Sequence, residues 1–357
     1  MSEKKTHKFF TVFPENPNID FARQRFFWLA VSLALIAGSF VMYKARGLQY
    51  GIEFAGGADI QVKFDEAVAT EDVRKALEDG KIEGASVQTI EESAKLDIEK
   101  GLTVGLGAGA ASPEFLIKVK GVEGEDIADT AKRTRTALEA KFGPSRTAEQ
   151  PTGKWEVRRQ ESASPSAVAE LTKKGMDSIF YSTILIFLYI VVRFAQVDWA
   201  SAVGYGVGAV IATAHDLLVI FAAFTYTGKE VTLPVVAGVL TVIGYSINDT
   251  IVVYDRIREN YSRNRSRELW ETINKSVNET LSRTVITGCT TFLVILSLMF
   301  LGGSVIHDFA YTLFIGILTG TYSSIFVASP IFVWTTKAIH RFQKSRAGTL
   351  EAKTPRV

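Results

Sequence analysis

Apolar residues along this chain are concentrated in six long runs that polar stretches separate. A helix needs roughly 20 mostly apolar residues to cross a membrane, and each run is of that order. One such run could lie in the core of a large soluble protein, but six could not. The pattern therefore predicts six membrane-spanning helices, at residues 26–43, 176–192, 200–226, 231–254, 281–301 and 309–336.

The first run could instead be a cleaved signal peptide. The polar region before it is long and contains Pro14 and Pro17. The run is also longer than the apolar core of an ordinary signal peptide. We therefore expect residues 26–43 to be retained as the first span.

Lysine and arginine residues lie mainly on one side of the predicted spans. They are frequent in the N-terminal tail, between the fourth and fifth spans and after the sixth span, whereas the short links on the other side contain Lys229 alone. Cytoplasmic loops carry such an excess, so we expect a multi-pass protein with both termini in the cytoplasm. The predicted order is a cytoplasmic tail (1–25), the first span (26–44), an outer domain (45–173), spans two to six (174–336) and a second cytoplasmic tail (337–357).

The outer domain alternates strand-like and helix-like patterns. Strands are predicted at 57–64, 85–91, 114–120 and 155–160, and helices at 70–79 and 125–142. This order, β-α-β twice, is that of a ferredoxin-like sheet with two helices on one face. The Gly- and Ala-rich stretch 102–111 and the Ser-rich link 162–172 are expected to be flexible. The domain contains no His and no Cys, so we do not expect a metal site in it.

A glycine-rich segment, 51–57 (GIEFAGG), follows the first span directly. It does not have the form of a phosphate-binding loop, because no Lys-Ser/Thr pair follows and no helix is expected to open there. We interpret it as a tight turn where backbones pack closely.

Four ionisable residues lie inside the predicted spans, where insertion of each costs about 2.5–3.5 kcal/mol and a functional role is the default interpretation. They are His215 and Asp216 in the third span, Asp249 in the fourth and Arg283 at the start of the fifth. Asp249 adjoins Asn248 in a polar patch, and antiparallel spans would place it at the depth of Arg283, so the two could face each other. The alternatives are a structural, hydrogen-bonded role for Asp216 and snorkelling of Arg283 to the cytoplasmic interface.

Two further patterns concern helix packing. Residues 255–280 mix apolar and charged positions at helical spacing, which predicts an amphipathic cytoplasmic helix on the membrane surface. Gly204 with Gly208, and Gly316 with Gly320, have the spacing that lets helices approach closely in a membrane.

Composition excludes several classes of protein. The 357 residues are 47% apolar and 22% charged, which is not the composition of a disordered, collagenous or disulfide-rich chain. The net charge is +2, so no global basic excess points to nucleic acid. The sequence shows no activated nucleophile, phosphate loop or metal-ligand cluster, and we do not expect an enzyme.

The chain resembles the SecD/SecF family of protein-export membrane proteins, which belongs to the RND superfamily. The residues that carry the resemblance are the segment 51–57, the pair His215-Asp216, the stretch 243–260 (IGYSINDTIVVYDRIREN) and 281–284 (LSRT). Glu53 and Ala55 depart from the family pattern, in which Asp and Thr or Ser are common. The long match in the fourth span is the most specific of the four.

The resemblance implies an α-helical membrane protein with six transmembrane helices, half of the RND plan, and an inserted α+β ferredoxin-like periplasmic domain. It implies a subunit that uses the proton motive force, without another cofactor, to assist Sec-dependent translocation across the bacterial inner membrane. The positions matching Asp249 and Arg283 carry the proton step in the family, and we expect Asn248, Asp216 and His215 to complete the pathway. Implied partners are a SecD-like subunit, the SecYEG translocon, YajC, the translocating unfolded polypeptide and membrane lipids.

Two other classes of function are compatible with six spans. A stand-alone RND exporter of a small molecule or lipid would need two six-span repeats or a close homodimer, and a large apolar pocket outside the membrane. A scaffold protein would use its buried charges only structurally. The single repeat and the small, charged outer domain disfavour the exporter.

Overall fold

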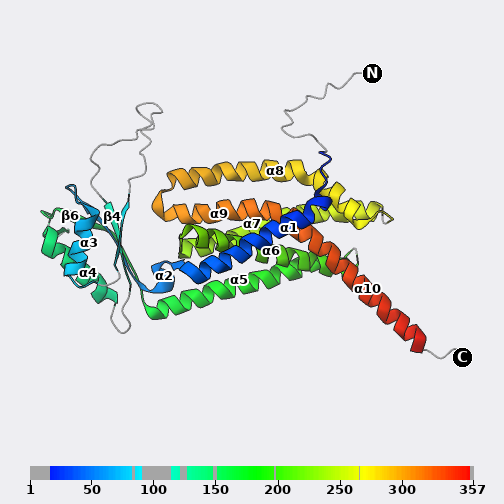
Figure 1. Ribbon diagram of the computed structural model, residues 1–357, viewed down its shortest axis with the longest axis horizontal. Helices are drawn as coiled ribbons and strands as arrows, with labels where there is room; N and C mark the ends of the chain where they lie inside the picture. The colour runs from blue at the N-terminus through cyan, green and yellow to red at the C-terminus, as the bar shows by residue number, and fades with distance from the viewer. Residues whose placement is uncertain are drawn as a thin grey trace, which may run out of the picture.

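The computed structural model describes residues 17–82, 85–90, 114–120, 127–147, 151–196, 198–264 and 266–353. In this part of the chain, six helical segments are long and apolar enough to cross a membrane, and together they form a bundle with a sheet domain at one end (Figure 1). The prediction of six spans is confirmed. Their bounds are Phe21–Arg46, Ser166–Phe194, Trp199–Thr227, Leu233–Arg263, Leu269–Leu301 and Ile306–Ser345.

The bundle consists of α1 (Phe21–Arg46), α5 (Pro165–Phe194), α6 (Trp199–Thr227), α7 (Leu233–Arg263), α8 (Leu269–Leu301), α9 (Gly303–Ser323) and α10 (Ser329–Lys353). Both predicted glycine pairs lie at close helix contacts. A methyl group on Gly316 would collide with Val242 of α7, and one on Gly320 would lie 2.8 Å from Cβ of Ser246. On α6, methyl groups at Gly204 and Gly208 would collide with Thr336 and Tyr254.

The sixth span is not one regular helix. Between α9 and α10, residues Ser324–Ala328 form a π-helical turn, and such turns are frequent at functional sites. Ser324 and Ser329 at its two ends are fully buried, and the Ser329 hydroxyl donates to the carbonyl oxygen of Ser324 (3.0 Å). The irregular turn therefore has hydrogen-bond partners inside the bundle.

The separate amphipathic helix predicted over 255–280 is not formed. Residues 255–263 complete α7, and 269–280 are the first turns of α8. Side chains join the two helix ends: Arg256 Nε donates to Glu279 (2.6 Å), and Asn260 Nδ2 donates to Ser276 Oγ (2.9 Å). The charged face that resembled a membrane-binding surface therefore pairs one helix with the other.

The outer domain has the predicted ferredoxin-like plan. Its sheet contains β2 (Gly57–Phe64), β3 (Ser86–Ile90), β4 (Glu114–Lys120), β5 (Ser145–Arg146) and β6 (Trp155–Ala163) in the order β3-β4-β2-β6-β5. The main strands are antiparallel, and helices α3 (Thr70–Asp79) and α4 (Ile127–Phe142) cover one face (Figure 1). The short edge strand β5 was not predicted, and the stretch 102–111 lies outside the described residues.

Strand alternation separates the two faces of the sheet. Along β2, Ala58, Ile60, Val62 and Phe64 are buried against α3 and α4, in a core with the fully buried Trp155. The residues between them, including Asp59, face the other way, toward the membrane bundle. The charged face of the sheet is thus the one that meets the spans.

The connections between domain and bundle are more ordered than predicted. Strand β6 runs to Ala163, and Ser164 already caps α5, so the expected flexible link over 162–172 is wrong. After α1, β1 (Gln49–Tyr50) pairs in parallel with β7 (Glu230–Val231), which lies between α6 and α7. A one-turn helix, α2 (Ile52–Ala55), then opens inside the glycine-rich segment, where no helix was expected. Gly56 and Gly57 follow at φ 75° and 136°, so the predicted tight turn is confirmed.

Candidate functional site

A buried carboxylate, Asp216 of α6, holds three helices together in the centre of the bundle. The residue is only 1% exposed. The hydroxyls of Ser246 on α7 and Ser323 on α9 both donate to its Oδ2 atom, at 2.6 and 3.0 Å. On its other oxygen, Oδ1 lies 3.1 Å from Nδ1 of His215. Both oxygen atoms of this acid therefore have hydrogen-bond partners.

The local sequence explains why three helices can reach one carboxylate. Gly320 of α9 lies directly against Ser246, since any side chain there would touch the serine. The two backbones are close enough for serines on both helices to contact the same oxygen atom. The predicted small-residue contact is thus what assembles the polar site.

His215 extends the cluster toward the first span. The residue is buried, and its Nε2 atom has no hydrogen-bond partner among the described residues. Its ring lies 5.9 Å, centroid to centroid, from that of Tyr322. The Tyr322 hydroxyl donates to the carbonyl oxygen of Trp28 in α1 (2.6 Å) and is 2.8 Å from Ser32 Oγ. A line of polar groups thus runs from α6 to α1.

Asp249, the second buried acid, lies on α7 one helical turn from Ser246. It is 3% exposed, and Thr321 of α9 donates to its Oδ2 atom at 3.2 Å. Thr321 and Ser323, two residues apart on α9, therefore bind one acid each. Because both acids depend on α9, a shift of this helix would change the hydrogen bonds of both.

The other two predicted site residues are exposed. Arg283 on α8 is exposed and forms no ion pair with Asp249 in the described part of the chain. Asn248 is exposed as well. The five predicted residues thus separate into a buried group (His215, Asp216 and Asp249) and an exposed one, and the expected face-to-face contact of Asp249 with Arg283 is not present.

Sequence reasoning missed the contribution of α9. Thr321 and Ser323 hold the two acids, yet neither was singled out. The available signal was the run of hydroxyl-bearing residues at 319–324 (TGTYSS) inside an otherwise apolar span. A hydroxyl side chain in a membrane helix costs little free energy, because it bonds to the backbone of its own helix. The run is therefore a weak signal in the sequence.

The cluster can hold and exchange protons but offers little else. Its groups are carboxylates, hydroxyls and one imidazole in an apolar bundle. Among the described residues, no three His, Cys, Asp or Glu side chains lie close enough to hold a metal ion. Protonation is therefore the chemistry that these side chains can support at this depth.

Comparison with known proteins places the chain in a family. Residues 145–338 match the family model described as protein export membrane protein SecD/SecF, C-terminal, and residues 45–68 match the SecD/SecF GG motif. The protein translocase subunit SecF of Petrotoga mobilis is 33% identical over 92% of this chain and 100% of its own length. That of Magnetococcus marinus is 41% identical over 90% of this chain and 93% of its own length.

Solved structures agree with the sequence relatives. The crystal structure of SecDF from Thermus thermophilus, titled a translocon-associated membrane protein, superimposes with a TM-score of 0.70 at 32% identity, over 90% of this chain and 39% of that one. A second structure, of SecDF in a super-membrane-facing form, gives a TM-score of 0.59 over 94% of this chain and 40% of that one. With family models, full-length relatives and solved structures in agreement, this chain belongs to the SecD/SecF family of protein-export membrane proteins.

Proposed function

We propose that this protein is a SecF-type subunit that uses the proton motive force to assist Sec-dependent protein translocation across a bacterial inner membrane. The observation that carries the proposal is Asp249, a carboxylate buried in the spanning bundle that forms no ion pair with any described residue. Its described hydrogen bond comes from one threonine hydroxyl. A charge with so little compensation is expensive in an apolar environment, and taking up a proton removes that cost.

The proton step needs a second charge whose distance to Asp249 can change. Arg283 suits this role because it is on the neighbouring helix but not in contact. Approach of a guanidinium favours the ionised carboxylate, and its withdrawal favours the protonated one. Each elementary charge that crosses the membrane field supplies about 2.3 kcal/mol per 100 mV, which can bias the packing of α7, α8 and α9 between two arrangements.

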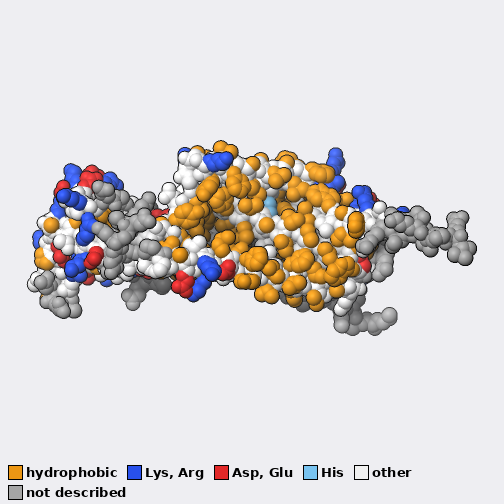
Figure 2. Space-filling model, turned by 90° about the horizontal axis from the view of Figure 1, so that it is seen from below, with side chains coloured by type: hydrophobic (Ala, Val, Ile, Leu, Met, Phe, Trp, Pro, Cys, Tyr) orange, Lys and Arg blue, Asp and Glu red, His pale blue; other side chains and the backbone are white. Residues whose placement is uncertain are grey.

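A SecD-like subunit is the partner that the surface of the bundle supports. Figure 2 shows one face of the bundle covered largely by hydrophobic side chains, as expected for contact with lipid. By contrast, α7 exposes Thr241, Gly244 and Asn248 on one face, and Arg283 is exposed on the adjacent α8. Polar groups facing lipid are costly, so this stripe is expected to be covered by another protein.

The relatives support the same partner. This chain matches 38% of the length of the Thermus thermophilus protein translocase subunit SecDF, in which SecD and SecF are named as one chain. We propose that SecYEG, YajC, lipids and the unfolded polypeptide meet the assembled complex. The energy source of that complex is the proton gradient, and no other cofactor is proposed.

The test is Asp249→Asn in the complex with its SecD-like partner. We expect proton flux in membrane vesicles and export of a secreted reporter to be lost while the protein is still inserted and assembled. Asp216→Asn should reduce both less, because an amide oxygen can still accept hydrogen bonds from Ser246 and Ser323. Asp177→Asn, at an exposed position of α5, is the matched control and should behave as wild type. Wild-type flux and export in Asp249→Asn would contradict the proposal and leave the buried acids a scaffold role.

A further inference from the structure

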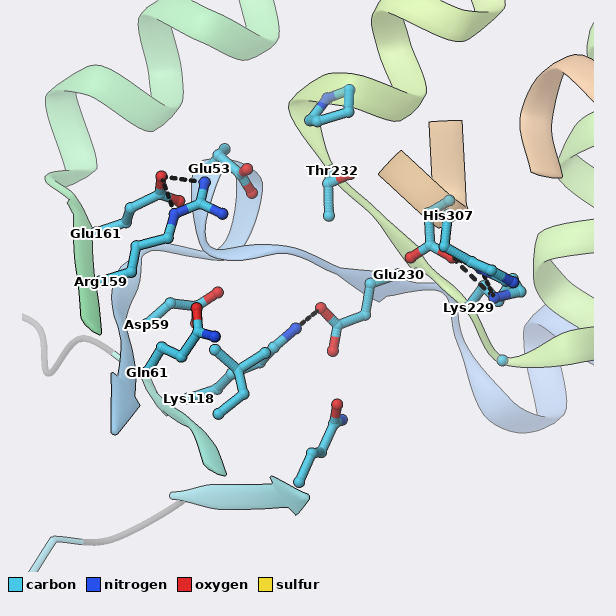
Figure 3. A pocket seen from close by; sticks show the side chains of 15 residues that line it. Glu53, Asp59, Gln61, Lys118, Arg159, Glu161, Lys229, Glu230, Thr232 and His307 are labelled. Carbon is cyan, nitrogen blue, oxygen red and sulfur yellow. Dashed lines mark hydrogen bonds and ion pairs between the residues drawn. The ribbon is translucent and has the colours of Figure 1, made fainter. Parts of the chain in front are cut away.

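A charged cavity of about 400 Å³ lies where the outer sheet meets the end of the membrane bundle (Figure 3). The sheet contributes Asp59, Lys118 and Glu161 from three adjacent strands. The bundle contributes Glu230 of β7 and, from α9, His307 and Asp308. The cavity therefore lies between the sheet domain and the membrane bundle.

Strand register brings the charges on the sheet side together. Asp59 on β2 is directly opposite Lys118 on β4 and opposite Glu161 on β6. Because alternate residues of β2 are in the core, the Asp59 side chain must point to the cavity. Lys118 thus has Asp59 beside it on the neighbouring strand of the same sheet.

Lys118 also bonds across the cavity. Its ammonium group donates to Oε2 of Glu230 on β7 (Figure 3), and both side chains are about one fifth exposed, at 19% and 21%. Strand β7 in turn pairs with β1 at the end of the first span. This ion pair therefore joins the sheet to the end of the bundle where α1 stops and α6 connects to α7.

Asp59 is incompletely satisfied in this arrangement. Its Oδ1 atom is buried with no hydrogen-bond partner among the described residues. The pKa of the Asp59 carboxyl is raised to about 6, chiefly because the group is buried; the charge of Lys118 lowers this pKa, and the charges of Glu230, Glu53 and Glu161 raise it. Asp59 can therefore change its charge at the pH of an acidified outer compartment.

Most other charged groups around the cavity have partners, and Glu53 adds a further negative charge there. Arg159 donates to Glu161 of the same strand (2.8 Å). Lys229 is paired with Asp308 (2.8 Å), and His307 lies 3.3 Å from each of these two groups. Lys118 is therefore the cation that pairs with Glu230 and whose charge also acts on Asp59, the residue opposite it in the sheet.

We propose that Asp59, Lys118 and Glu230 form a proton-controlled clamp between the periplasmic sheet and the outer end of the membrane bundle. With Asp59 protonated, Lys118 is a net positive charge facing Glu230, and the clamp is tight. With Asp59 ionised, Lys118 is neutralised within its own sheet, two acids compete for it, and the clamp weakens. The clamp goes beyond the intramembrane proton step, and it uses none of the residues of that site.

The sign of the pH dependence follows from the two states of Asp59. We call the state with the Lys118–Glu230 ion pair formed the docked state. In this state the pKa of Asp59 is about 6, against an ordinary value of 3.8 when the carboxyl is solvated. Docking is therefore coupled to the uptake of a proton by Asp59. It is most favourable at a pH below 3.8, the pKa of the solvated carboxyl, and it weakens as the pH rises through about 6. The outer side of an energised membrane is the acidic side, so a proton gradient would favour the docked state.

The experiment measures the distance between sheet and bundle in the full chain in lipid nanodiscs. Spin labels are placed at Lys75→Cys on α3 and Leu301→Cys at the outer end of α8, both exposed, with Cys289 replaced by Ser. Between about pH 7.5 and about pH 5, we expect the ratio of docked to undocked distances to rise several-fold. A ratio that does not change with pH would overturn the proposal.

Variants separate the clamp from other causes. Asp59→Asn imitates the protonated acid and should be docked at every pH, whereas Lys118→Gln should be undocked at every pH. The double variant that exchanges the charges, Lys118→Glu with Glu230→Lys, should restore docking. That result would show that Lys118→Gln undocks because the ion pair is lost and not because the protein is unfolded. Glu66→Gln, in the bend after β2, and His307→Gln in the cavity should keep the wild-type response. A wild-type pH response in Asp59→Asn, or its loss in His307→Gln, would refute the clamp without affecting the test of Asp249.

Discussion

Ser246 and Ser323, on two different helices, donate hydrogen bonds to the same oxygen atom of Asp216, at 2.6 and 3.0 Å. Three helices thus share one acceptor atom. Hydrogen bonds of this kind stabilise the bundle only while α7 and α9 keep their present distance. The site therefore contributes to the packing of the bundle as well as to its chemistry.

Replacing either serine should destabilise the bundle measurably. Ser246→Ala or Ser323→Ala removes a hydrogen bond to a buried carboxylate, at a cost of about 1–3 kcal/mol. The two losses should not add in the double variant, because both bonds end on one atom. Thermal unfolding in detergent measures the effect. Ser178→Ala, at an exposed site where the hydroxyl bonds to its own helix, is the control and should leave the unfolding temperature unchanged.

Proton flux and export should depend on the positive charge of Arg283. Arg283→Ala is expected to abolish proton flux and export, because no other cation is then available to Asp249. Arg283→Lys should keep part of both, since the positive charge is retained although the planar guanidinium is lost. Arg263→Ala, at the exposed C-terminal end of α7, serves for comparison. Full activity of Arg283→Ala would show that the residue only snorkels to the membrane surface.

Packing at Gly316 should tolerate no side chain. Gly316→Val would force a collision with Val242 of α7, and overpacking of this kind costs about 1–3 kcal/mol. Gly244→Ala on α7 is the matched control, because nothing lies within 4 Å of the position of its added methyl group. We expect a lower unfolding temperature for the first variant only. Equal unfolding temperatures would mean that α7 and α9 are not in close contact.

The orientation in the membrane can be tested with reporter fusions. A reporter fused after Gly348 should be cytoplasmic and one inserted at Gly107 should be on the outer side, because lysines and arginines are concentrated next to the termini. The measurement is the activity of each fused reporter enzyme, chosen so that it folds on only one side of the membrane. The reverse result at either position would exclude the six-span topology.

The long elements could be predicted because each carries its own signal. Six apolar runs and the two β-α-β patterns extend over many residues, and their periodicity does not depend on the rest of the fold. The bounds of β2 and α3 agree with the prediction to the residue. The charged segment after the fourth span was misread because amphipathic helices pairing with each other have the same pattern as one that binds a membrane.

The short elements and the contacts of the site could not be predicted in this way. Strands β1 and β7 have two residues each and exist because they meet across 180 positions of sequence, so neither carries a pattern. The position of Arg283 relative to Asp249 depends on the rotation of α8, which sequence spacing does not fix. The roles of Thr321 and Ser323 depend in the same way on how α9 packs.

Ser164 alone separates the last strand of the sheet from α5. With one residue between them, the connection has no slack. A pull on the sheet must therefore tilt or shift the 30 residues of α5 rather than extend a tether. In mechanical terms, strand β6 and helix α5 act as a lever that crosses the membrane surface, so work done on the outer domain reaches the helices directly.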